Sequence, residues 1–334
     1  MSVKTASLPR PFAFRRIHSL FGLWIVIFLM EHLLTNSQAA LMIGDSGEGF
    51  IRAVNFLKNL PYLHVIEVVL LGVPILYHMV FGIHYLFTSK MNAYSSGGNK
   101  PALKKYGRNH AYSWQRITSW ILLVGMIAHV GYMRFYMYPE EVEMGEKQAF
   151  FVRVTMDPGL YTVSDRLGVK LYNQSGIEQV RKGVESHAKE LDVLSKQVEA
   201  LQERDETVYR ENIDQVLAHY QSLEEEKAYL KGLEKRKISK GQVIAEASNF
   251  GTATLLIVRD SFKSVFKSIL YTIFVLAAVF HAFNGLWTFM ITWGIVLKMR
   301  SQSVALNVCK GIMLLVGFLG LIAVWGTYYL NLRT

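Results

Sequence analysis

Five apolar stretches along the chain are long enough to cross a membrane. They cover approximately residues 17–41, 62–88, 114–138, 265–297 and 304–330. A membrane-spanning helix needs about 20 mostly apolar residues, and each stretch meets that length. The pattern therefore predicts an all-α membrane protein with five transmembrane helices.

A polar insertion at residues 139–262 separates the third and fourth stretches. Within it, apolar residues recur in steps of three and four over 177–201, with His187 as the one polar interruption. After a break near 204–206, further apolar residues continue with helical spacing. Two such stripes can bury each other, so we expect an antiparallel helical hairpin over about residues 177–237.

The segment in front of this hairpin, residues 156–173, combines turn residues with short alternation, which favours a small β-hairpin. The chain then divides into residues 1–138 with the first three membrane helices, the insertion 139–262, and residues 263–334 with the last two. The insertion is interpreted as a cap that packs on itself, and a role in binding a ligand or partner stays open.

The charges follow the same division. Of the 26 acidic residues, 22 lie in the insertion, whereas the remaining 210 residues hold four acids and 19 bases. These bases lie between apolar stretches, which favours membrane topology over nucleic-acid binding. The one cysteine, Cys309, excludes a disulfide framework, a cysteine-ligated cluster and covalent c-type haem.

Lysine and arginine in short loops predict the orientation of the chain. Eleven of them flank one side, in residues 1–16, 89–113 and 298–303, against three on the other. We therefore expect the N-terminus inside and the C-terminus outside, which places the insertion outside by the parity of the spans. No cleavable signal peptide is expected, because the first apolar stretch continues into Glu31 and His32.

Four histidines lie at matched depths in four of the spans. His32 and His129 each follow the start of their span by 15 residues, about 22 Å from the inner edge. His78 and His281 each follow theirs by 16 residues, about 24 Å from the outer edge. The gap between the pairs is about 16 Å, which is too wide for one metal bound by all four.

A single intramembrane histidine can equally serve as a hydrogen-bond partner between helices, but two facing imidazoles at one depth suit six-coordinate haem. The two pairs therefore predict two haem b groups, held without covalent attachment. His64 and His84 lie near span ends and are expected at the interface, and His187 and His219 are expected to be solvated.

At these residues the sequence resembles a known family. The matching stretches are Phe14-Arg15-Arg16-Ile17-His18-Ser19-Leu20, Glu31-His32-Leu33, Pro74-Ile75-Leu76-Tyr77-His78, Gln115-Arg116-Ile117-Thr118, Ala128-His129-Val130 and Phe280-His281-Ala282-Phe283-Asn284-Gly285-Leu286-Trp287. They are similar to the di-haem cytochrome b membrane anchor of succinate dehydrogenases and fumarate reductases, the single-chain type with five helices. The long insertion departs from that family, whose third and fourth helices are joined by a short connection.

The resemblance implies that His32 and His129 ligate the outer haem and that His78 and His281 ligate the inner haem. It further implies partnership with a cytoplasmic flavoprotein subunit, which would carry the flavin, and with an iron–sulfur subunit. Electrons from succinate would pass through both haems to menaquinone, or in reverse during fumarate reduction. The location implied is the bacterial cytoplasmic membrane.

Four residues at the inner edge and one acid near the outer edge are further candidates. The resemblance implies that His18 and Ser19 lie near the propionates of the inner haem, and Arg16 and Arg116 could also donate to these carboxylates. Ordinary positive-inside flanking explains the same bases. Glu67 lies about 7 Å below the outer edge and is a candidate proton donor for quinone, or else a structural hydrogen-bond partner of polar residues in the first span.

Two other functions remain open at this point. A cytochrome b subunit of a formate dehydrogenase or hydrogenase also uses paired histidines, and co-purifying partners would distinguish it. A non-redox membrane protein such as a transporter would use the histidines structurally, but the sequence shows no inverted repeat or broken helix of the kind found in transporters.

Overall fold

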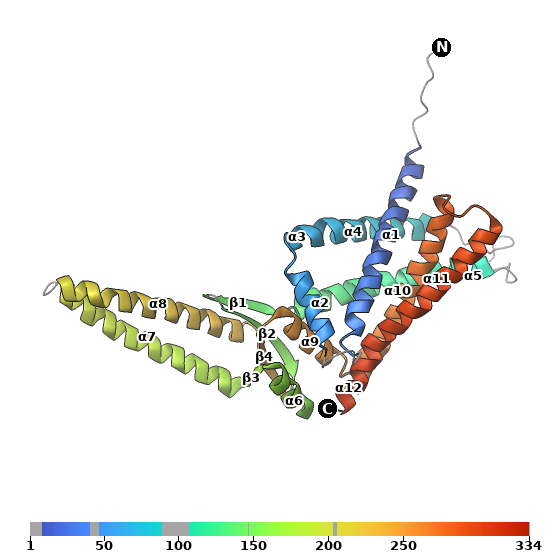
Figure 1. Ribbon diagram of the computed structural model, residues 1–334. Helices are drawn as coiled ribbons and strands as arrows, with labels where there is room; N and C mark the ends of the chain where they lie inside the picture. Colours follow the sequence, from blue (N-terminus) through green and yellow to red (C-terminus); the bar gives the residue numbers. More distant parts are fainter. Residues whose placement is uncertain (1–8, 41–46, 89–106, 146, 203–205, 334) are drawn as a thin grey trace, which may run out of the picture. The chain divides into compact units, whose positions relative to one another are not determined.

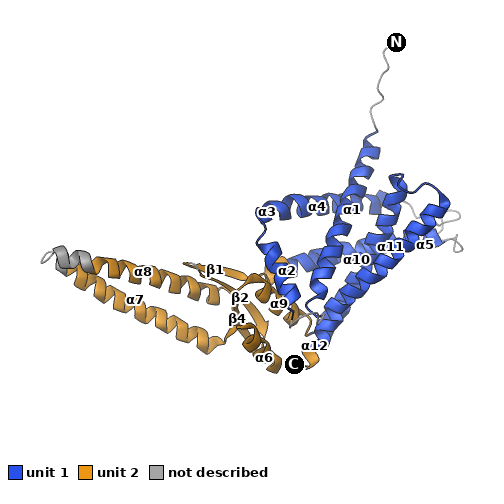
Figure 2. Ribbon diagram, viewed as in Figure 1, with its two compact units in different colours: residues 1–132, 264–330 blue, residues 133–263, 331–334 orange. Residues whose placement is uncertain are grey.

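The computed structural model describes residues 9–40, 47–88, 107–145, 147–202 and 206–333. Contacts within the chain divide it into two compact units, coloured separately in Figure 2. Unit 1 comprises residues 1–132 and 264–330, and unit 2 comprises residues 133–263 and 331–334.

Unit 1 is built from helices that follow the apolar stretches (Figure 1). These elements are α1 (Arg10–Ser37), α2 (Glu48–Lys58), α3 (Leu63–Val65), η1 (Ile66–Gly72), α4 (Val73–Thr88), α5 (Gly107–Val130), α10 (Val265–Thr292), α11 (Met299–Leu321) and η3 (Ile322–Gly326). Two further segments, η2 (Gly131–Tyr136) and α12 (Thr327–Arg333), begin in unit 1 and end in unit 2. Within the described residues, five continuous helical runs are long and apolar enough to cross a membrane. The predicted fold class is therefore confirmed, and the chain is a multi-pass membrane protein.

The observed helices extend beyond the apolar stretches at several ends. α1 begins at Arg10 and α11 at Met299, because polar residues at a membrane interface can continue a helix outside the hydrocarbon core. The predicted end of the first span at Leu41 lies outside the described residues, as do several loop bases that set the predicted orientation. α2, a short helix with Phe50 buried, occupies a stretch that the apolar pattern leaves as a loop.

Two short π-helical segments, η1 and η3, interrupt the second and fifth helical runs, and a third, η2, ends the third run. A π-helical turn changes the i→i−4 pairing of nearby carbonyl groups, which then need other donors in an apolar environment. The indole nitrogen of Trp24 donates to one of them, the carbonyl of Leu70 in η1. A side chain of α1 thus satisfies part of the backbone of η1.

Unit 2 contains a four-stranded antiparallel sheet. Its strands are β1 (Glu140–Met144), β2 (Lys147–Thr155), β3 (Lys170–Tyr172) and β4 (Gln242–Ala247), in the order β1-β2-β4-β3. Phe151 of β2 lies opposite Glu246 of β4. Phe151 and Ile244 are buried with Ile177 and Leu233 from the helices that connect the strands, so the core of the sheet depends on residues far apart in the chain.

The prediction of a β-hairpin at residues 156–173 is wrong. Residues 158–167 form helix α6 (Pro158–Leu167), which begins with Asp157 as N-cap and Pro158 at its first turn and ends at Gly168 in the left-handed region. These are the usual helix start and stop residues. β3 follows, but it pairs with β4 and has no local partner strand.

Helices α7 (Gln174–Gln202) and α8 (Glu206–Glu234) lie side by side and are joined by residues 203–205, which are outside the described residues. Val184, Leu191 and Val198 of α7 are buried against Val216 and Leu223 of α8. The polar position in the α7 stripe, His187, is part of this contact because its Nδ1 lies 3.0 Å from Glu226 Oε2.

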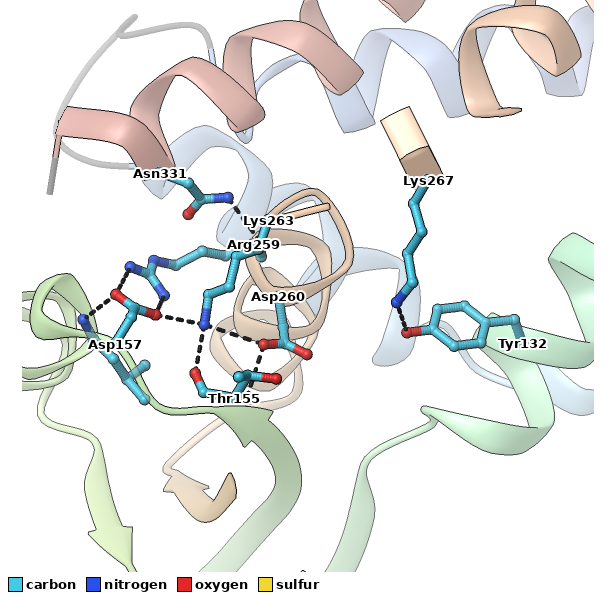
Figure 3. A network of polar contacts seen from close by, with 9 residues as sticks. Tyr132, Thr155, Asp157, Arg259, Asp260, Lys263, Lys267 and Asn331 are labelled. Atoms are coloured by element: carbon cyan, nitrogen blue, oxygen red, sulfur yellow. Dashed lines mark hydrogen bonds and ion pairs between the residues drawn. The ribbon is translucent and has the colours of Figure 1, made fainter. Parts of the chain in front are cut away.

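Asp157 links two parts of unit 2, and Figure 3 shows its contacts. Its carboxylate accepts from the backbone of Leu160 at 3.0 Å and from both terminal nitrogens of Arg259 at 2.7 and 2.9 Å. Lys263 forms a further ion pair with it. Arg259 and Lys263 are in or next to α9 (Phe250–Ser261), so this carboxylate ties the start of α6 to the end of α9.

Burial by itself would raise the pKa of Asp157, but the hydrogen bonds and charges of Arg259 and Lys263 outweigh it and hold that pKa well below its usual range. A folded-state pKa below the unfolded value contributes stability that is present above about pH 4 and is lost as the pH falls toward the folded pKa. The protection of α6 in unit 2 should therefore weaken in acid.

We predict that Asp157→Ala destabilises unit 2 by about 2–3 kcal/mol, because α6 loses its cap and the mostly buried Arg259 loses its carboxylate. Hydrogen–deuterium exchange of the α6 amides in the full chain measures this. Asp157→Asn keeps the cap acceptor and should lose less, and the exposed Asp165→Asn should change little. Equal exchange in Asp157→Ala and the unaltered chain would contradict the prediction.

Candidate functional site

Four helices of unit 1 bring the intramembrane histidines together in two pairs. The rings of His32 (α1) and His129 (α5) have centroids 5.9 Å apart and planes at 80°. Those of His78 (α4) and His281 (α10) are 6.3 Å apart at 81°. Each pair joins two different helices, and these are the same pairs that matched depth predicts.

The two pairs lie at different levels along α1. His18 of α1 stacks on His78 with centroids 3.9 Å apart, and His32, fourteen residues later, contacts His129. Fourteen helical residues rise about 21 Å. This separation along the helix is similar to the gap of about 16 Å that residue counting predicts, and it keeps the two pairs as distinct sites.

In the pair formed by His78 and His281, neighbouring groups determine which ring nitrogen carries the proton. His78 Nδ1 lies 3.0 Å from the backbone oxygen of His18, which can only accept, so Nδ1 is the donor. His281 Nδ1 lies 3.3 Å from the hydroxyl oxygen of Thr118. Because that hydroxyl donates to the carbonyl of Trp114 at 2.8 Å, its oxygen accepts from His281. A neutral imidazole protonated at Nδ1 has its lone pair on Nε2.

The pair formed by His32 and His129 has looser contacts at the same atoms. His129 Nδ1 lies 3.1 Å from the hydroxyl of Tyr271, which can donate or accept. His32 Nδ1 lies 3.5 Å from Asn36 Nδ2, and that amide also donates to the backbone oxygen of His32 at 2.7 Å. Protein contacts therefore fix the tautomer of this pair less firmly.

All four histidines thus have a neighbour at Nδ1, and among the described residues none has a hydrogen-bond partner at Nε2. A histidine that ligates a metal commonly uses one ring nitrogen for the metal while a hydrogen bond to the other orients the ring. The acceptors at Nδ1 of His78 and His281 therefore suit ligation through Nε2, and the Tyr271 hydroxyl can accept from His129 Nδ1 in the same way. The Asn36 amide nitrogen beside His32 Nδ1 is a donor, so this contact does not hold an Nδ1–H at His32.

The spacing of the rings also fits a metal held between them. An imidazole nitrogen ligates a metal at about 2.0–2.1 Å, so two rings on opposite sides of one metal have centroids about 6 Å apart. Both observed separations are close to this value. Within the described part of the chain, no three His, Cys, Asp or Glu side chains gather as a protein-only metal site requires. Haem iron needs only two protein ligands, so the residues present fit haem b.

Two glycines occur where these rings are closely approached. A Cβ atom at Gly22 of α1 would lie 3.0 Å from Cε1 of His78, and one at Gly125 of α5 would lie 2.4 Å from Phe274. Phe274 itself contacts His129, with ring centroids 5.7 Å apart. Neither position has room for a side chain without movement of an aromatic ring, so glycine permits the packing around both pairs.

Of the four residues expected near the propionates, His18 contacts His78 directly, through its ring and its backbone oxygen. Its own Nδ1 is buried and has no hydrogen-bond partner among the described residues. The other three residues, Arg16, Ser19 and Arg116, form contacts with helix ends.

Arg16 donates to the carbonyl of Thr292 and lies 5.1 Å over the ring of Trp293. The indole of Trp293 donates to Ser19 Oγ at 3.3 Å, so Arg16 and Ser19 meet at the end of α10. Arg116 donates to the backbone oxygen of Leu86 at 2.9 Å, near the end of α4. These bonds fasten helix ends, whatever further partner each residue has.

Glu67 is in η1 with its carboxylate 3.8 Å from Nδ1 of His64, and the two side chains are 36% and 88% exposed. Glu31, the other acid in the first two spans, accepts from Thr35 at 2.8 Å in its own helix. Both acids are half-buried, and Glu67 has a histidine within ion-pair distance.

Sequence reasoning missed the residues that orient the ligands. Thr118 and Gln115 lie in one of the matching stretches, and Gln115 donates to the backbone oxygen of His281 at 3.1 Å. Asn284, three residues after His281, donates to Gln115 at 2.8 Å. Gln115 and Thr118 lie three residues apart, as do His281 and Asn284, so each pair is about one helical turn apart. This spacing was a usable signal in the sequence. Tyr271 had none, because its role depends on how α10 faces α5.

Comparison with characterised proteins finds similarity to the succinate dehydrogenase cytochrome b558 subunit of Bacillus subtilis (strain 168), with 37% identity over 122 residues. The aligned part is 36% of this chain and 54% of that protein, so the chain spans about half the length of the relative it matches. No family model matches the chain, and no solved structure matches it. The similarity confirms the resemblance that the sequence motifs indicate.

We predict that Thr118→Val weakens haem binding at one pair only. The variant removes the acceptor for His281 Nδ1–H, and loss of such a contact typically costs about 10–100-fold in metal affinity. Titration of the haem-free chain with haem b, followed by absorbance, measures the change.

The matched control is Thr272→Val, because Thr272 is a threonine in α10, the helix of His281, but hydrogen-bonds Ser268 and Trp325 and no histidine among the described residues. An equal effect of both variants would show that the loss is a general one and not a result of ring orientation.

Proposed function

We propose that this chain is the membrane-anchor cytochrome b subunit of a succinate dehydrogenase or fumarate reductase. The observation that carries the proposal is the pair of two-histidine sites, each with a neighbour at Nδ1 and with Nε2 unpartnered among the described residues. The similarity to the cytochrome b558 subunit of Bacillus subtilis supports the choice of complex.

In this proposal His78 and His281 hold the inner haem b, and His32 and His129 hold the outer one. Bound haem supplies one-electron redox chemistry, and the chain sets its environment. Thr118 and the backbone oxygen of His18 accept from Nδ1 of the two rings of the inner pair, which would leave both Nε2 atoms free to ligate the haem iron. The looser contacts of the outer pair give the chain a means to tune the two sites differently.

The propionates of the inner haem would take the unpartnered His18 Nδ1 as a donor, together with Ser19, Arg16 and Arg116. The three latter residues also hold the ends of α4 and α10 through the contacts described above. Each can donate to a carboxylate while it keeps one backbone or indole contact, because guanidinium and hydroxyl groups have several hydrogen-bonding positions.

The chain would work with two soluble subunits, a flavoprotein that oxidises succinate and an iron–sulfur subunit that delivers the electrons. With the N-terminus inside, electrons enter at the pair His78 and His281 and leave at the pair His32 and His129. Menaquinone takes them up near the outer face of the bacterial cytoplasmic membrane, or menaquinol supplies them when fumarate is reduced. The insertion 139–262 then lies outside.

Quinone reduction takes up two protons for two electrons, so an acid near the quinone is needed. Glu67 would hold and pass such a proton, with His64 3.8 Å away as its neighbour. Both residues are at the start of the second span, at the level toward which the outer pair lies. An ionisable residue in this position is a functional candidate by default.

A second electron-transfer complex would use the same haem sites, namely a formate dehydrogenase or hydrogenase with a cytochrome b subunit. Purification of the chain from its own membrane distinguishes the two. Co-purification of a flavoprotein with succinate dehydrogenase activity supports the proposal, and co-purification of a molybdenum- or nickel-containing subunit would replace it.

We predict that the four ligand variants fall into two groups. His78→Ala and His281→Ala should lose the same component of the reduced haem spectrum, and His32→Ala and His129→Ala should both lose the other. Each variant removes one of the two axial ligands, which weakens a haem held only by ligation and packing and changes the spectrum of any haem that stays bound. Low-temperature absorbance spectra of the purified variants measure this.

The exposed His64→Ala and His84→Ala are the controls and should keep both components. A shared spectral loss in His32→Ala and His78→Ala would contradict the pairing.

We predict that Glu67→Gln slows menaquinone reduction by about 10²-fold, the range expected for loss of a proton donor, while both haems stay bound. Steady-state activity with succinate and a soluble menaquinone analogue measures the rate. Transfer of electrons from succinate to an artificial acceptor at the flavoprotein is the internal control and should be unchanged. His64→Gln tests the neighbour, and unaltered quinone reduction in Glu67→Gln would remove this acid from the proposal.

A further inference from the structure

A cavity of about 350 Å³ lies between three helices of unit 1. It is at the end where α5 and α11 begin and α10 ends. Phe283 and Met313 contribute apolar walls, and Asn284 and Trp287 face it from α10. Arg108 and Lys310 line it from α5 and α11, so one mostly apolar space has two cations on different helices.

Neither cation is neutralised by a carboxylate of the described chain. Arg108 lies 5.3 Å over the ring of Trp287 and 3.3 Å from the amide oxygen of Gln302. Lys310 is exposed and forms no hydrogen bond or ion pair within the described residues. Both contacts of Arg108 are to uncharged groups, and Lys310 has no charged partner among the described residues. The positive charges of both residues therefore remain at the cavity.

The rest of this end of unit 1 offers no acid either. Outside the insertion the chain has only Glu31, Asp45, Glu48 and Glu67. Glu48 and Glu67 belong to elements at the opposite end of the spans. Glu31 is 21 residues from the start of α1, or about 32 Å from that helix end. Asp45 lies outside the described residues. An anion at the cavity must therefore come from outside these residues.

The depth of Lys310 suits an anion at the membrane interface. It follows Val304, the first residue of the predicted apolar stretch, by six residues, or about 9 Å. A lysine side chain can extend along apolar surface toward the headgroup level. Arg108, in the first turn of α5, is already near that level, so both cations can reach one headgroup.

We propose that this cavity binds an anionic phospholipid of the membrane. The headgroup phosphate lies between Arg108 and Lys310, and an acyl chain follows the wall formed by Phe283 and Met313. Basic pockets between transmembrane helices bind acidic headgroups in this way, and arginine pairs well with phosphate oxygens. The proposal rests on the membrane location of unit 1 and is independent of the haem ligands.

The test uses the purified full chain in nanodiscs of phosphatidylcholine that contain about 10–30% phosphatidylglycerol, so that both lipids are available to the cavity. The lipid that stays bound after transfer to detergent is measured by native mass spectrometry. We expect phosphatidylglycerol to be retained over phosphatidylcholine, and Arg108→Gln with Lys310→Gln to lower its retention at least about tenfold.

Arg300→Gln is the matched control, because Arg300 is a cation at the same end of α11 that does not line the cavity. It should retain the lipid normally. Met313→Trp places a larger side chain in the cavity but keeps both cations. It should lower retention of the lipid, as the double variant should. This variant keeps the test decisive where the double variant fails to fold.

Equal retention of the two lipids, or normal retention in the double variant, would overturn the proposal. A parallel titration with inorganic phosphate separates the two sources of the anion. Displacement of phosphatidylglycerol by millimolar phosphate would assign the site to free phosphate, whereas no displacement supports the lipid. None of these measurements reads the haem, so the outcome is separate from that of the proposed function.

Discussion

An imidazole inside a membrane has two ring nitrogens that both need partners, because an unpaired polar atom in an apolar environment is costly. In this protein each of the four intramembrane histidines has a neighbour at Nδ1 and none at Nε2 within the described residues. The rings occur in two pairs, with centroids 5.9 and 6.3 Å apart. A shared metal between the two rings would satisfy the Nε2 atoms of a pair at once, and this requirement links the helix packing to the proposed chemistry.

The helices supply what that arrangement needs. α1 contributes to both levels, with His18 against His78 and His32 paired with His129. α4, α5 and α10 each contribute one further ring. Glycines at 22 and 125 leave space where a side chain would meet a ring. Unit 2 is organised differently, since its sheet joins strands that precede and follow the α7–α8 hairpin, and Asp157 fastens α6 to the end of α9.

The membrane spans and the histidine pairs could be expected from sequence, because hydropathy and residue counting along regular helices carry the information. The parts that could not be expected depend on contacts between distant segments. Tyr271 meets His129 only through the rotation of α10 against α5. β3 forms by pairing with β4, more than 70 residues later. The sequence predicts a β-hairpin where α6 occurs, because Pro158 and Gly168 serve equally as turn residues and as helix ends.

The most direct test of this account is the haem content of the purified chain, measured as pyridine haemochrome against protein mass. The account predicts two b haems per chain, one for each histidine pair. One haem per chain would mean that one of the pairs does not bind haem as proposed. Absence of haem from protein reconstituted with an excess of it would contradict the central claim and leave the histidines as hydrogen-bonding residues between helices.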